Sequence, residues 1–347
     1  MNILVLYTRL TGYWIACMRK DYELNGNNYL VFRTPPSKDA PFKIESEAGI
    51  EICDYNTKEI LKIQAQITDF KPDVIYVSGW SNKDYLKIVK VYKTKGLPVV
   101  AGMDNQWLGT MKQRMASFFS FWLIHKYISH IWVPGKPQYF YARKLGFKPQ
   151  NILSGLYCAD EVIFKDIVQH EHKKELIFVG RIVDHKGVKE LFEVIEELIF
   201  DQQFKIKLHI IGNGPLEHLI PKHKNIKHTA FVDPDKLPQL LSNAGTFILP
   251  SLYEAWGVVV HEAAIAGLPI ITTYQCGAGT DLVIERFNGY KYNAKDKDHL
   301  RQIIKKVTNQ SAEDYFKMSV HSKFLGSKLN LTNWSAQINT LKNYYKT

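Results

Sequence analysis

The sequence contains only four cysteines among its 347 residues, and none of them stands at the paired spacing of a zinc site. Cys17, Cys53, Cys158 and Cys276 are scattered, which favours a reducing compartment over a disulfide framework. The chain also lacks a basic leader before its first, short apolar run, so we expect a buried first strand rather than a signal peptide. These absences predict a cytoplasmic protein.

Acidic residues are missing from one long stretch. The chain has a formal net charge of +11, and residues 105–159 contain seven Lys or Arg but no Asp or Glu. Within this stretch, Phe118–Ile124 is apolar nearly all round a helix and is too short to span a bilayer. Two interpretations remain open: a helix packed on its own sheet, or an interfacial helix with basic flanks. The second predicts peripheral binding to an anionic membrane through Lys112, Arg114, Phe118, Trp122 and Lys126.

Motifs for other ligand classes are absent. Although the chain is basic, it has no nucleic-acid-binding motif, so no nucleic acid partner is expected. The glycine turn at Ile210–Pro215 lacks the third glycine of a dinucleotide fingerprint, because Glu217 stands there, and this argues against an NAD enzyme. No Asp-x-Asp pair stands at a plausible metal-binding position. The sequence therefore predicts neither a metal nor another cofactor.

Strand-like apolar runs alternate with helical stretches along the chain, which favours α/β architecture with parallel sheets. The predicted strands are 3–7, 29–32, 74–78, 98–101, 130–133, 175–179, 207–211, 226–231, 246–249 and 269–272. The predicted helices are 57–68, 82–94, 106–128, 137–144 and 188–200. The chain is long enough for two cores, so we expect two Rossmann-like units rather than one large sheet. We place an N-terminal domain at 1–158, a second domain at 159–328 and a terminal helix at 329–347.

The most informative segment is Pro250–Thr272, which predicts a turn, a helix and a strand in that order. The helix at 258–266 consists almost wholly of Val, Ala and Ile, so Glu262 inside it needs hydrogen-bond donors. A ribose diol offers two hydroxyls to one carboxylate. Glu254 precedes the helix, where free backbone N–H groups favour polar ligands. We interpret the two glutamates as a clamp for a nucleotide sugar; a purely structural pair of carboxylates is the alternative.

A second segment, Phe178–Gly187, carries two cations on the loop between a predicted strand and helix. Ligands of α/β folds bind at the carboxyl ends of parallel strands, and Gly180 permits close approach of the backbone. Arg181 and Lys186 are suited to neutralise the growing charge of a diphosphate leaving group without a metal. The alternative is a solvated basic loop.

The pattern Pro-Ser-x-x-Glu-x-x-Gly-x-x-x-x-Glu-Ala-x-x-x-Gly-x-Pro resembles the signature of the family 4 retaining glycosyltransferases. The matching residues are Pro250, Ser251, Glu254, Gly257, Glu262, Ala263, Gly267 and Pro269. The loop at 180–187 is similar to the family's Gly-Arg-x-x-x-x-Lys-Gly diphosphate loop, and Gly212 lies in a turn similar to its Gly-x-Gly-Pro turn. The resemblance covers about the whole chain, and it is most specific in the second domain. It implies a GT-B fold, in which two Rossmann-like parallel-sheet domains face a cleft and the terminal helix crosses back to the first domain.

The resemblance also implies an activity. A retaining glycosyltransferase of this kind moves a sugar from a nucleoside-diphosphate sugar, of UDP or GDP type, to a glycan or lipid-linked acceptor. Surface polysaccharide or lipopolysaccharide synthesis at the inner face of the membrane is the expected setting. Glu254 and Asp104 are the expected catalytic residues. The expected nucleotide-sugar-binding residues are Arg181, Lys186, Gly180, Gly212, Val232, Tyr253, Ala255, Trp256, Gly257, Val258 and Glu262.

The first domain departs from the family pattern. Only Gly12, with Arg9 nearby, stands where many members have a glycine pair, and Asp104 stands where many have a His. Asp104 either orients the acceptor and stabilises positive charge at the anomeric carbon, or it caps a helix. Trp107 either stacks on an acceptor or lies in the core or at its rim. In the second domain, Thr280-Asp281 replaces the usual end of a Gly-x-x-Glu motif at the donor sugar.

Three other functions remain compatible with the sequence. One is a different enzyme of GT-B fold, such as a nucleotide-sugar epimerase or a phosphorylase. Another is a catalytically silent nucleotide-sugar-binding partner protein that kept the fold. The third is a peripheral membrane scaffold. The sequence leaves the oligomeric state open.

Overall fold

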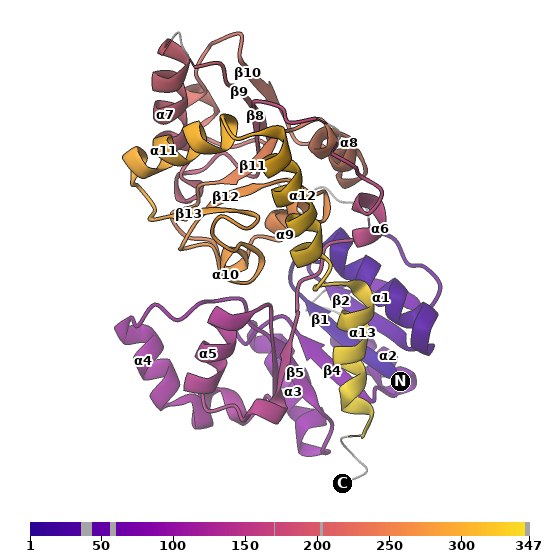
Figure 1. The fold of residues 1–347 in the computed structure, drawn as a ribbon. Helices are drawn as coiled ribbons and strands as arrows, with labels where there is room; N and C mark the ends of the chain where they lie inside the picture. The colour runs from indigo at the N-terminus through magenta and orange to yellow at the C-terminus, as the bar shows by residue number, and fades with distance from the viewer. Residues whose placement is uncertain (36–43, 56–59, 170, 202–203, 344–347) are drawn as a thin grey trace. The chain divides into compact units, whose positions relative to one another are not determined.

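The computed structural model describes residues 1–35, 44–55, 60–169, 171–201 and 204–343, and the chain divides into two compact units. Unit 1 comprises Met1–Cys158 together with the C-terminal segment that begins at Leu331. Unit 2 comprises Ala159–Asn330. Each unit is built on one parallel sheet, and Figure 1 shows helices packed around each sheet.

The sheet of unit 1 has seven strands in the order β3-β2-β1-β4-β5-β6-β7. They are β1 (Asn2–Tyr7), β2 (Asn28–Arg33), β3 (Ile50–Asp54), β4 (Val74–Val77), β5 (Val99–Gly102), β6 (His130–Val133) and β7 (Ile152–Ser154). The helices are α1 (Gly12–Asn25), α2 (Ile60–Phe70), α3 (Lys83–Thr94), α4 (Met111–Phe118), the π-helical turn η2 (Phe121–His125), α5 (Lys136–Lys144), η3 (Pro149–Asn151), α13 (Leu331–Asn339) and η7 (Thr340–Asn343). Successive residues of β1 enter two different apolar clusters, so both faces of the sheet are covered.

The sheet of unit 2 has six strands in the order β10-β9-β8-β11-β12-β13. They are β8 (Glu175–Val179), β9 (Lys207–Ile211), β10 (Ile226–Thr229), β11 (Thr246–Leu249), β12 (Ile270–Thr273) and β13 (Gly289–Tyr292). The helices are α6 (Glu161–Phe164), η4 (Asp184–Lys186), α7 (Val188–Phe200), η5 (Glu217–Leu219), η6 (Pro234–Lys236), α8 (Leu237–Ser242), α9 (Val258–Ile265), α10 (Gly277–Leu282), α11 (Lys297–Thr308) and α12 (Ala312–Gly326).

Each sheet has one point at which the strand order reverses. It lies between β1 and β4 in unit 1 and between β8 and β11 in unit 2. At such a point the loops that follow the two strands diverge to opposite faces and leave room for a ligand at their carboxyl ends. The two reversal points therefore predict where each unit binds its substrate.

The C-terminal helix α13 packs on α1 of unit 1, and Figure 1 shows the two side by side. Asp21 of α1 is fully buried and accepts hydrogen bonds from Ser335 Oγ (2.6 Å) and Asn339 Nδ2 (2.7 Å) of α13. The indole ring of Trp334 lies 5.2 Å from that of Trp14. Both a buried carboxylate and an aromatic cluster thus fix the helix in unit 1.

The prediction of two parallel-sheet units is confirmed, and all ten predicted strands are present within two residues of their expected ends. Strands β3, β7 and β13 were not predicted, and β10 ends at Thr229 instead of residue 231. The continuous helix predicted at 106–128 is wrong, because the chain forms α4 and the separate turn η2 there. Residues 57–59 of another predicted helix lie outside the described residues. None of the described helices is both long and apolar enough to cross a membrane.

Candidate active site

The loops after β8 and β11 meet at the reversal point of unit 2. Gly187 ends the first loop with φ +68°, and a Cβ atom there would lie 2.0 Å from the carbonyl oxygen of Pro250 in the second. Only glycine fits such a contact in this conformation. The backbone N–H of Leu252 also donates to the carbonyl of His185 at 2.9 Å. Backbone packing therefore fixes the two predicted binding loops against each other.

This packing brings together two of the predicted site residues. The Lys186 ammonium group forms an ion pair with the Glu254 carboxylate, and their side chains are only 14% and 16% exposed. The hydroxyl of Ser251, which is fully buried, donates to the same carboxylate at 3.3 Å. Gly257 caps α9 with φ +96°, and a Cβ atom there would approach Glu254 Cγ to 3.1 Å. The cation and the acid therefore neutralise each other in this structure.

Glu262 lies on α9 and is half-buried. Burial raises the pKa of its carboxyl group from 4.5 to about 7, and no donor among the described residues contacts the carboxylate. The adjacent His261 is different: its Nδ1 accepts from the Ala159 N–H at 3.0 Å, and its Nε2 donates to the Gly326 carbonyl at 2.9 Å. Burial lowers the pKa of His261 to about 4, so the ring is neutral and structural. Of these two neighbouring side chains, Glu262 is therefore the one that retains unused hydrogen-bonding capacity toward the described residues.

The glycine loops predicted to approach the nucleotide lie at the same edge of the sheet. The N–H of Gly180 donates to the Ile211 carbonyl at 3.0 Å, and the N–H of Gly212 donates to the Thr229 carbonyl at 3.0 Å. Arg181 is exposed beside them, and Val232 is half-buried after the end of β10. The structure thus brings the ends of β8, β9 and β10 together.

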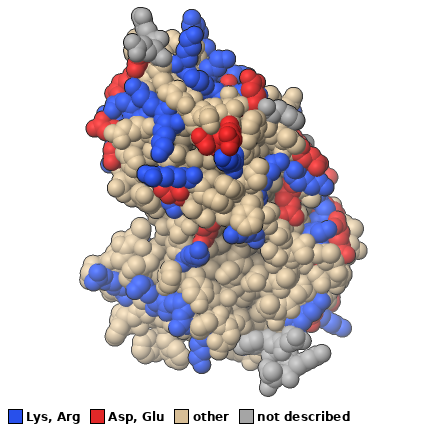
Figure 2. Space-filling view, in the orientation of Figure 1, with Lys and Arg blue, Asp and Glu red and all other residues tan. Residues whose placement is uncertain are grey.

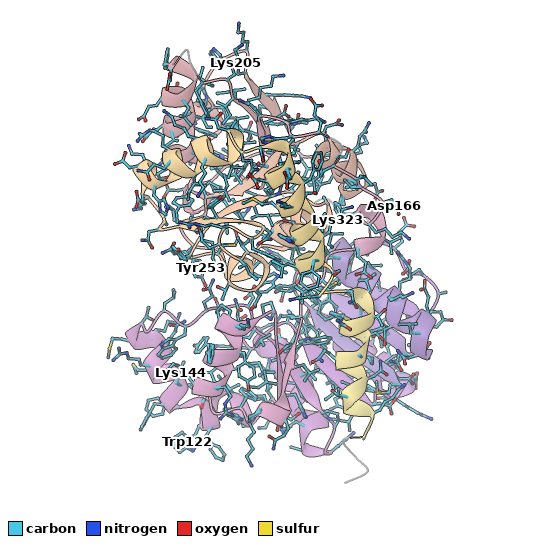
Figure 3. All side chains as sticks on the ribbon, viewed as in Figure 1. Trp122, Lys144, Asp166, Lys205, Tyr253 and Lys323 are labelled. Atoms are coloured by element: carbon cyan, nitrogen blue, oxygen red, sulfur yellow. The ribbon has the colours of Figure 1, made fainter. Side chains whose placement is uncertain are left out.

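The remaining predicted residues of the second domain lie in the loop before α9 or at its start. Tyr253, Ala255 and Val258 are half-buried, and Figure 3 labels Tyr253 on this loop. Trp256 differs, because its side chain is only 2% exposed and its carbonyl accepts the N–H of Ala278 at 2.8 Å. The structure therefore does not present the Trp256 side chain for the predicted contact. Sequence reasoning also gave no role to Ser251, although it is part of the recognised pattern and holds Glu254.

A cavity of about 360 Å³ lies at the reversal point of unit 1, and it contains the predicted residues Arg9 and Asp104. Tyr157 donates to Asp104 Oδ2 at 3.2 Å. The other lining residues are Tyr7, Thr8, Thr11, Tyr13, Tyr76, Ser78 and Gly102. Burial raises the pKa of Tyr7, Tyr76 and Tyr157 well above the ordinary value, so these phenols remain protonated. The helix-cap alternative for Asp104 is wrong, because Thr110 caps the next helix, α4.

Two other predicted residues of unit 1 lie outside the lining of this cavity. Gly12 begins α1, and a Cβ atom there would meet nothing within 4 Å, so no steric reason for a glycine exists. The ring of Trp107 lies 5.4 Å from that of Tyr141, and the ammonium group of Lys144 lies 4.9 Å above it. Trp107 thus occupies a packed position at the rim.

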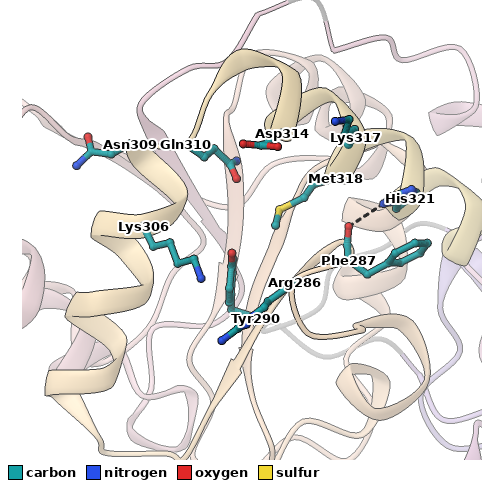
Figure 4. A pocket seen from close by; sticks show the side chains of 10 residues that line it. All are labelled: Arg286, Phe287, Tyr290, Lys306, Asn309, Gln310, Asp314, Lys317, Met318 and His321. Atoms are coloured by element: carbon teal, nitrogen blue, oxygen red, sulfur yellow. Dashed lines mark hydrogen bonds between the residues drawn. The ribbon is translucent and has the colours of Figure 1, made fainter.

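Unit 2 has a cavity of about 540 Å³, which lies at the end of the strands opposite to the Lys186–Glu254 pair (Figure 4). It lies around Tyr290, near the amino end of β13, and His321 of α12 contacts the Phe287 carbonyl there at 2.9 Å. None of the predicted site residues lines it. We therefore place the candidate site at the Lys186–Glu254 pair. Among the described residues, no group of three His, Cys, Asp or Glu side chains is arranged to hold a metal ion.

Residues 160–321 match the model of a protein family described as glycosyl transferases group 1. An uncharacterised glycosyltransferase of Methanocaldococcus jannaschii is 25% identical over 171 residues, which is 47% of this chain and 43% of that protein. The capsular polysaccharide biosynthesis glycosyltransferase CapM of Staphylococcus aureus is 30% identical over 146 residues, 39% of this chain and 37% of CapM. The chain spans less than half the length of these curated relatives.

Solved structures extend the likeness to the whole fold. The HepE protein of Anabaena, in complex with UDP, matches with a TM-score of 0.76 at 15% identity over 99% of this chain and 100% of that chain. At this identity the match shows the fold alone. Two parallel-sheet Rossmann-like domains with such neighbours define the GT-B fold, so the predicted fold class is confirmed.

Proposed function

We propose that the protein is a retaining glycosyltransferase that uses a nucleoside-diphosphate sugar. The observation that carries this proposal is the arrangement at the reversal point of unit 2. There a half-buried Lys186–Glu254 pair stands beside Glu262, a carboxylate that no donor in the described parts of the chain contacts. Both lie within the segment that matches the glycosyltransferase family model. The UDP in the HepE complex, a protein of the same fold, supports a nucleoside diphosphate as the carrier.

Each residue has a proposed role. Glu262 accepts hydrogen bonds from the ribose hydroxyls, which satisfies its unused capacity. Arg181 and Lys186 hold the diphosphate, so that Lys186 exchanges its partner from Glu254 to a phosphate oxygen when the donor binds. Glu254 then faces the transferred sugar. Backbone groups near Gly180, Gly212 and Val232, and the segment from Tyr253 to Val258, complete the donor site.

The proposed reaction retains the configuration at the anomeric carbon. The bond from that carbon to the diphosphate oxygen breaks, and the acceptor hydroxyl forms a new bond on the same face. The acceptor's proton passes to the departing phosphate oxygen. Arg181 and Lys186 stabilise the charge that develops on the diphosphate, which is the contribution that a metal makes in other enzymes. We therefore propose that the reaction needs no metal or other cofactor.

The proposed acceptor is a glycan or a lipid-linked glycan, bound in the cavity of unit 1. Neutral phenol groups, Arg9 and Asp104 line that cavity, and together they offer donors and acceptors that suit a sugar's hydroxyls. The name of CapM supports a role in surface polysaccharide or lipopolysaccharide synthesis. On this proposal the enzyme works in the cytoplasm, at the inner face of the membrane.

A thermal-shift panel tests the donor class. We expect UDP or GDP, and the matching nucleotide sugar, to raise the melting temperature, because a ligand at 100 times its Kd stabilises the folded state by about 2.7 kcal/mol. Product analysis with the identified sugar then separates transfer from epimerisation or phosphorolysis. A panel in which no nucleotide or nucleotide sugar shifts the melting temperature would exclude the proposed donor site.

Replacing Lys186 tests the diphosphate contact. We expect Lys186→Ala to weaken binding of the nucleoside diphosphate by about tenfold, as for loss of a charged hydrogen bond, and to leave binding of the nucleoside unchanged. Isothermal titration calorimetry measures both. The matched control is Lys189→Ala, because Lys189 forms an exposed ion pair with Asp184 at 2.6 Å nearby. If the variant loses equal affinity for the nucleoside and for the nucleoside diphosphate, Lys186 does not bind the phosphate groups.

A further inference from the structure

One surface of unit 1 exposes many large apolar side chains. It is formed by α4, η2 and the residues beside them, and we call it the aromatic surface. Its members are Leu108, Met111, Met115, Phe118, Phe119, Phe121, Trp122 and Leu123. Phe118, Phe121 and Trp122 are 75%, 69% and 62% exposed, and Figure 3 shows Trp122 at the outer edge of the unit.

Most of the helix expected here does not pack on its own sheet, and within α4 and η2 only Ile124 belongs to the apolar core of unit 1. No residue of α4 is buried, and only Ile124 of η2 is. Eight of the 22 exposed large hydrophobic side chains in the described residues fall within 108–123. Contiguous exposed apolar groups of this kind mark sites that contact a membrane or another protein. The alternative of a helix packed on its own sheet therefore holds for Ile124 but not for the other apolar residues of 118–124.

The charges in the stretch of chain that forms the aromatic surface have one sign. Lys112 and Arg114 lie on α4, Lys126 follows η2, and no Asp or Glu occurs between residues 105 and 159. Figure 2 shows Lys and Arg beside uncharged surface in this part of unit 1. A partner of negative charge is attracted to this surface, whereas a second copy of the chain would bring like charges together.

A cavity of about 590 Å³ adjoins the aromatic surface: Leu123 belongs to both, and Lys126, which follows η2, also lines the cavity. Lys83, Lys87 and Lys90 of α3 also line it. Lys87 forms an ion pair with Asp84 at 2.8 Å, so the positive charge of the cavity rests on the other lysines. A basic cavity beside an apolar surface matches the order of a bilayer, in which anionic phosphate groups lie next to acyl chains.

We propose that the aromatic surface enters the interface of an anionic phospholipid bilayer. Lipid phosphate groups then bind in the adjoining cavity that Lys83, Lys90 and Lys126 line. Interfacial helices bury apolar side chains at the boundary between headgroups and acyl chains, and Lys and Arg beside them bind anionic lipid. This binding needs neither a nucleotide nor an acceptor, so it stands apart from glycosyl transfer and can be tested without it.

Co-sedimentation with lipid vesicles tests the proposal. The protein sediments with vesicles that contain phosphatidylglycerol and stays in solution with vesicles of phosphatidylcholine alone. The double variant Phe121→Ser, Trp122→Ser loses most of the binding. The triple variant Lys112→Gln, Arg114→Gln, Lys126→Gln binds about 100-fold more weakly, since each neighbouring cation contributes about fivefold.

Matched controls distinguish binding through this surface from nonspecific hydrophobic adsorption and from an effect of the protein's total net charge. Phe200→Ser with Phe324→Ser removes two exposed aromatic rings of unit 2, and Lys222→Gln, Lys224→Gln, Lys227→Gln removes three exposed cations there. Both control variants retain vesicle binding on our proposal. An equal loss in either control would overturn it.

The same protein preparations test two further points. One is whether the variants fold, and the other is whether a second copy of the chain, rather than a membrane, binds the aromatic surface. Both aromatic-surface variants keep the parent melting temperature and its shift with nucleotide, because the replaced side chains are exposed. On our proposal, ultracentrifugation without lipid should show a monomer. A dimer that Trp122→Ser dissociates, together with vesicle binding that ignores the substitutions, would assign this surface to a second copy instead.

Discussion

Glu254→Ala should abolish glycosyl transfer while nucleotide binding persists. The carboxylate faces the transferred sugar on our proposal, and loss of a group that acts in the transition state lowers the rate by about 100-fold or more. Nucleoside-diphosphate binding should be unchanged or tighter, because Lys186 no longer forms its ion pair with Glu254. Single-turnover transfer assays and calorimetry measure the two effects separately.

The stability of this variant needs its own measurement. Lys186 is only 14% exposed, so removal of its partner leaves a largely buried charge and should lower the melting temperature. Glu254→Gln, which keeps an oxygen acceptor for Lys186, should lose activity with a smaller loss of stability. Glu193→Ala is the matched control, because it removes an exposed ion pair with Lys297 in the same unit. Parent activity in Glu254→Ala would remove this residue from the mechanism.

Glu262 should make nucleoside binding depend on pH around neutrality. The pKa of its carboxyl group is raised to about 7 by burial, and the ionised form accepts hydrogen bonds from ribose. When the pH falls from 8 to 6, the Glu262 carboxylate becomes protonated in most molecules of the free protein. Nucleoside binding should therefore weaken by about tenfold. A nucleoside is the right probe, because it has no phosphate that titrates in this range.

Glu262→Gln should remove this pH dependence and weaken binding at pH 8. It should also stabilise the free protein at pH 8 but not at pH 4. The folded protein binds the proton more tightly than the unfolded chain, so ionisation costs stability as the pH rises from 4.5 to 7. With partial exposure taken into account, this cost is about 1–2 kcal/mol. The control Glu196→Gln is exposed on α7 and should change neither property. Unaltered pH dependence in Glu262→Gln would be evidence against the ribose contact.

The strands missed in the sequence share one physical property. β3, β7 and β13 each lie at the edge of a sheet. Central parallel strands are buried on both faces and form continuous apolar runs, whereas β3, β7 and β13 each contain a polar residue that is not buried. Residues 50–54 of β3 show this, because only Ile50 of the strand is buried. The alternation of strands and helices therefore predicted the fold, while the number of strands had to come from the structure.

The sequence indicated which residues form the candidate site, but it did not indicate which of them contact one another. Spacing and resemblance indicated Lys186, Glu254 and Glu262, yet no pattern shows that the first two neutralise each other without ligand. Whether a side chain in an apolar helix is buried with partners depends on the elements packed against it. His261 and Glu262 are neighbours on α9, and only the structure shows that the histidine is satisfied and the glutamate is not.

The position of α13 imposes an order on the folding of the two units during synthesis. Unit 2 is continuous in sequence, so it has all of its residues once Asn330 has been synthesised. Unit 1 lacks part of its core until later, because Asp21 and Trp14 gain their contacts with α13 only when residues 334–339 have left the ribosome. Helix α1 must therefore wait for α13, which is separated from it in the sequence by the whole of unit 2, before Trp14 is covered on that side.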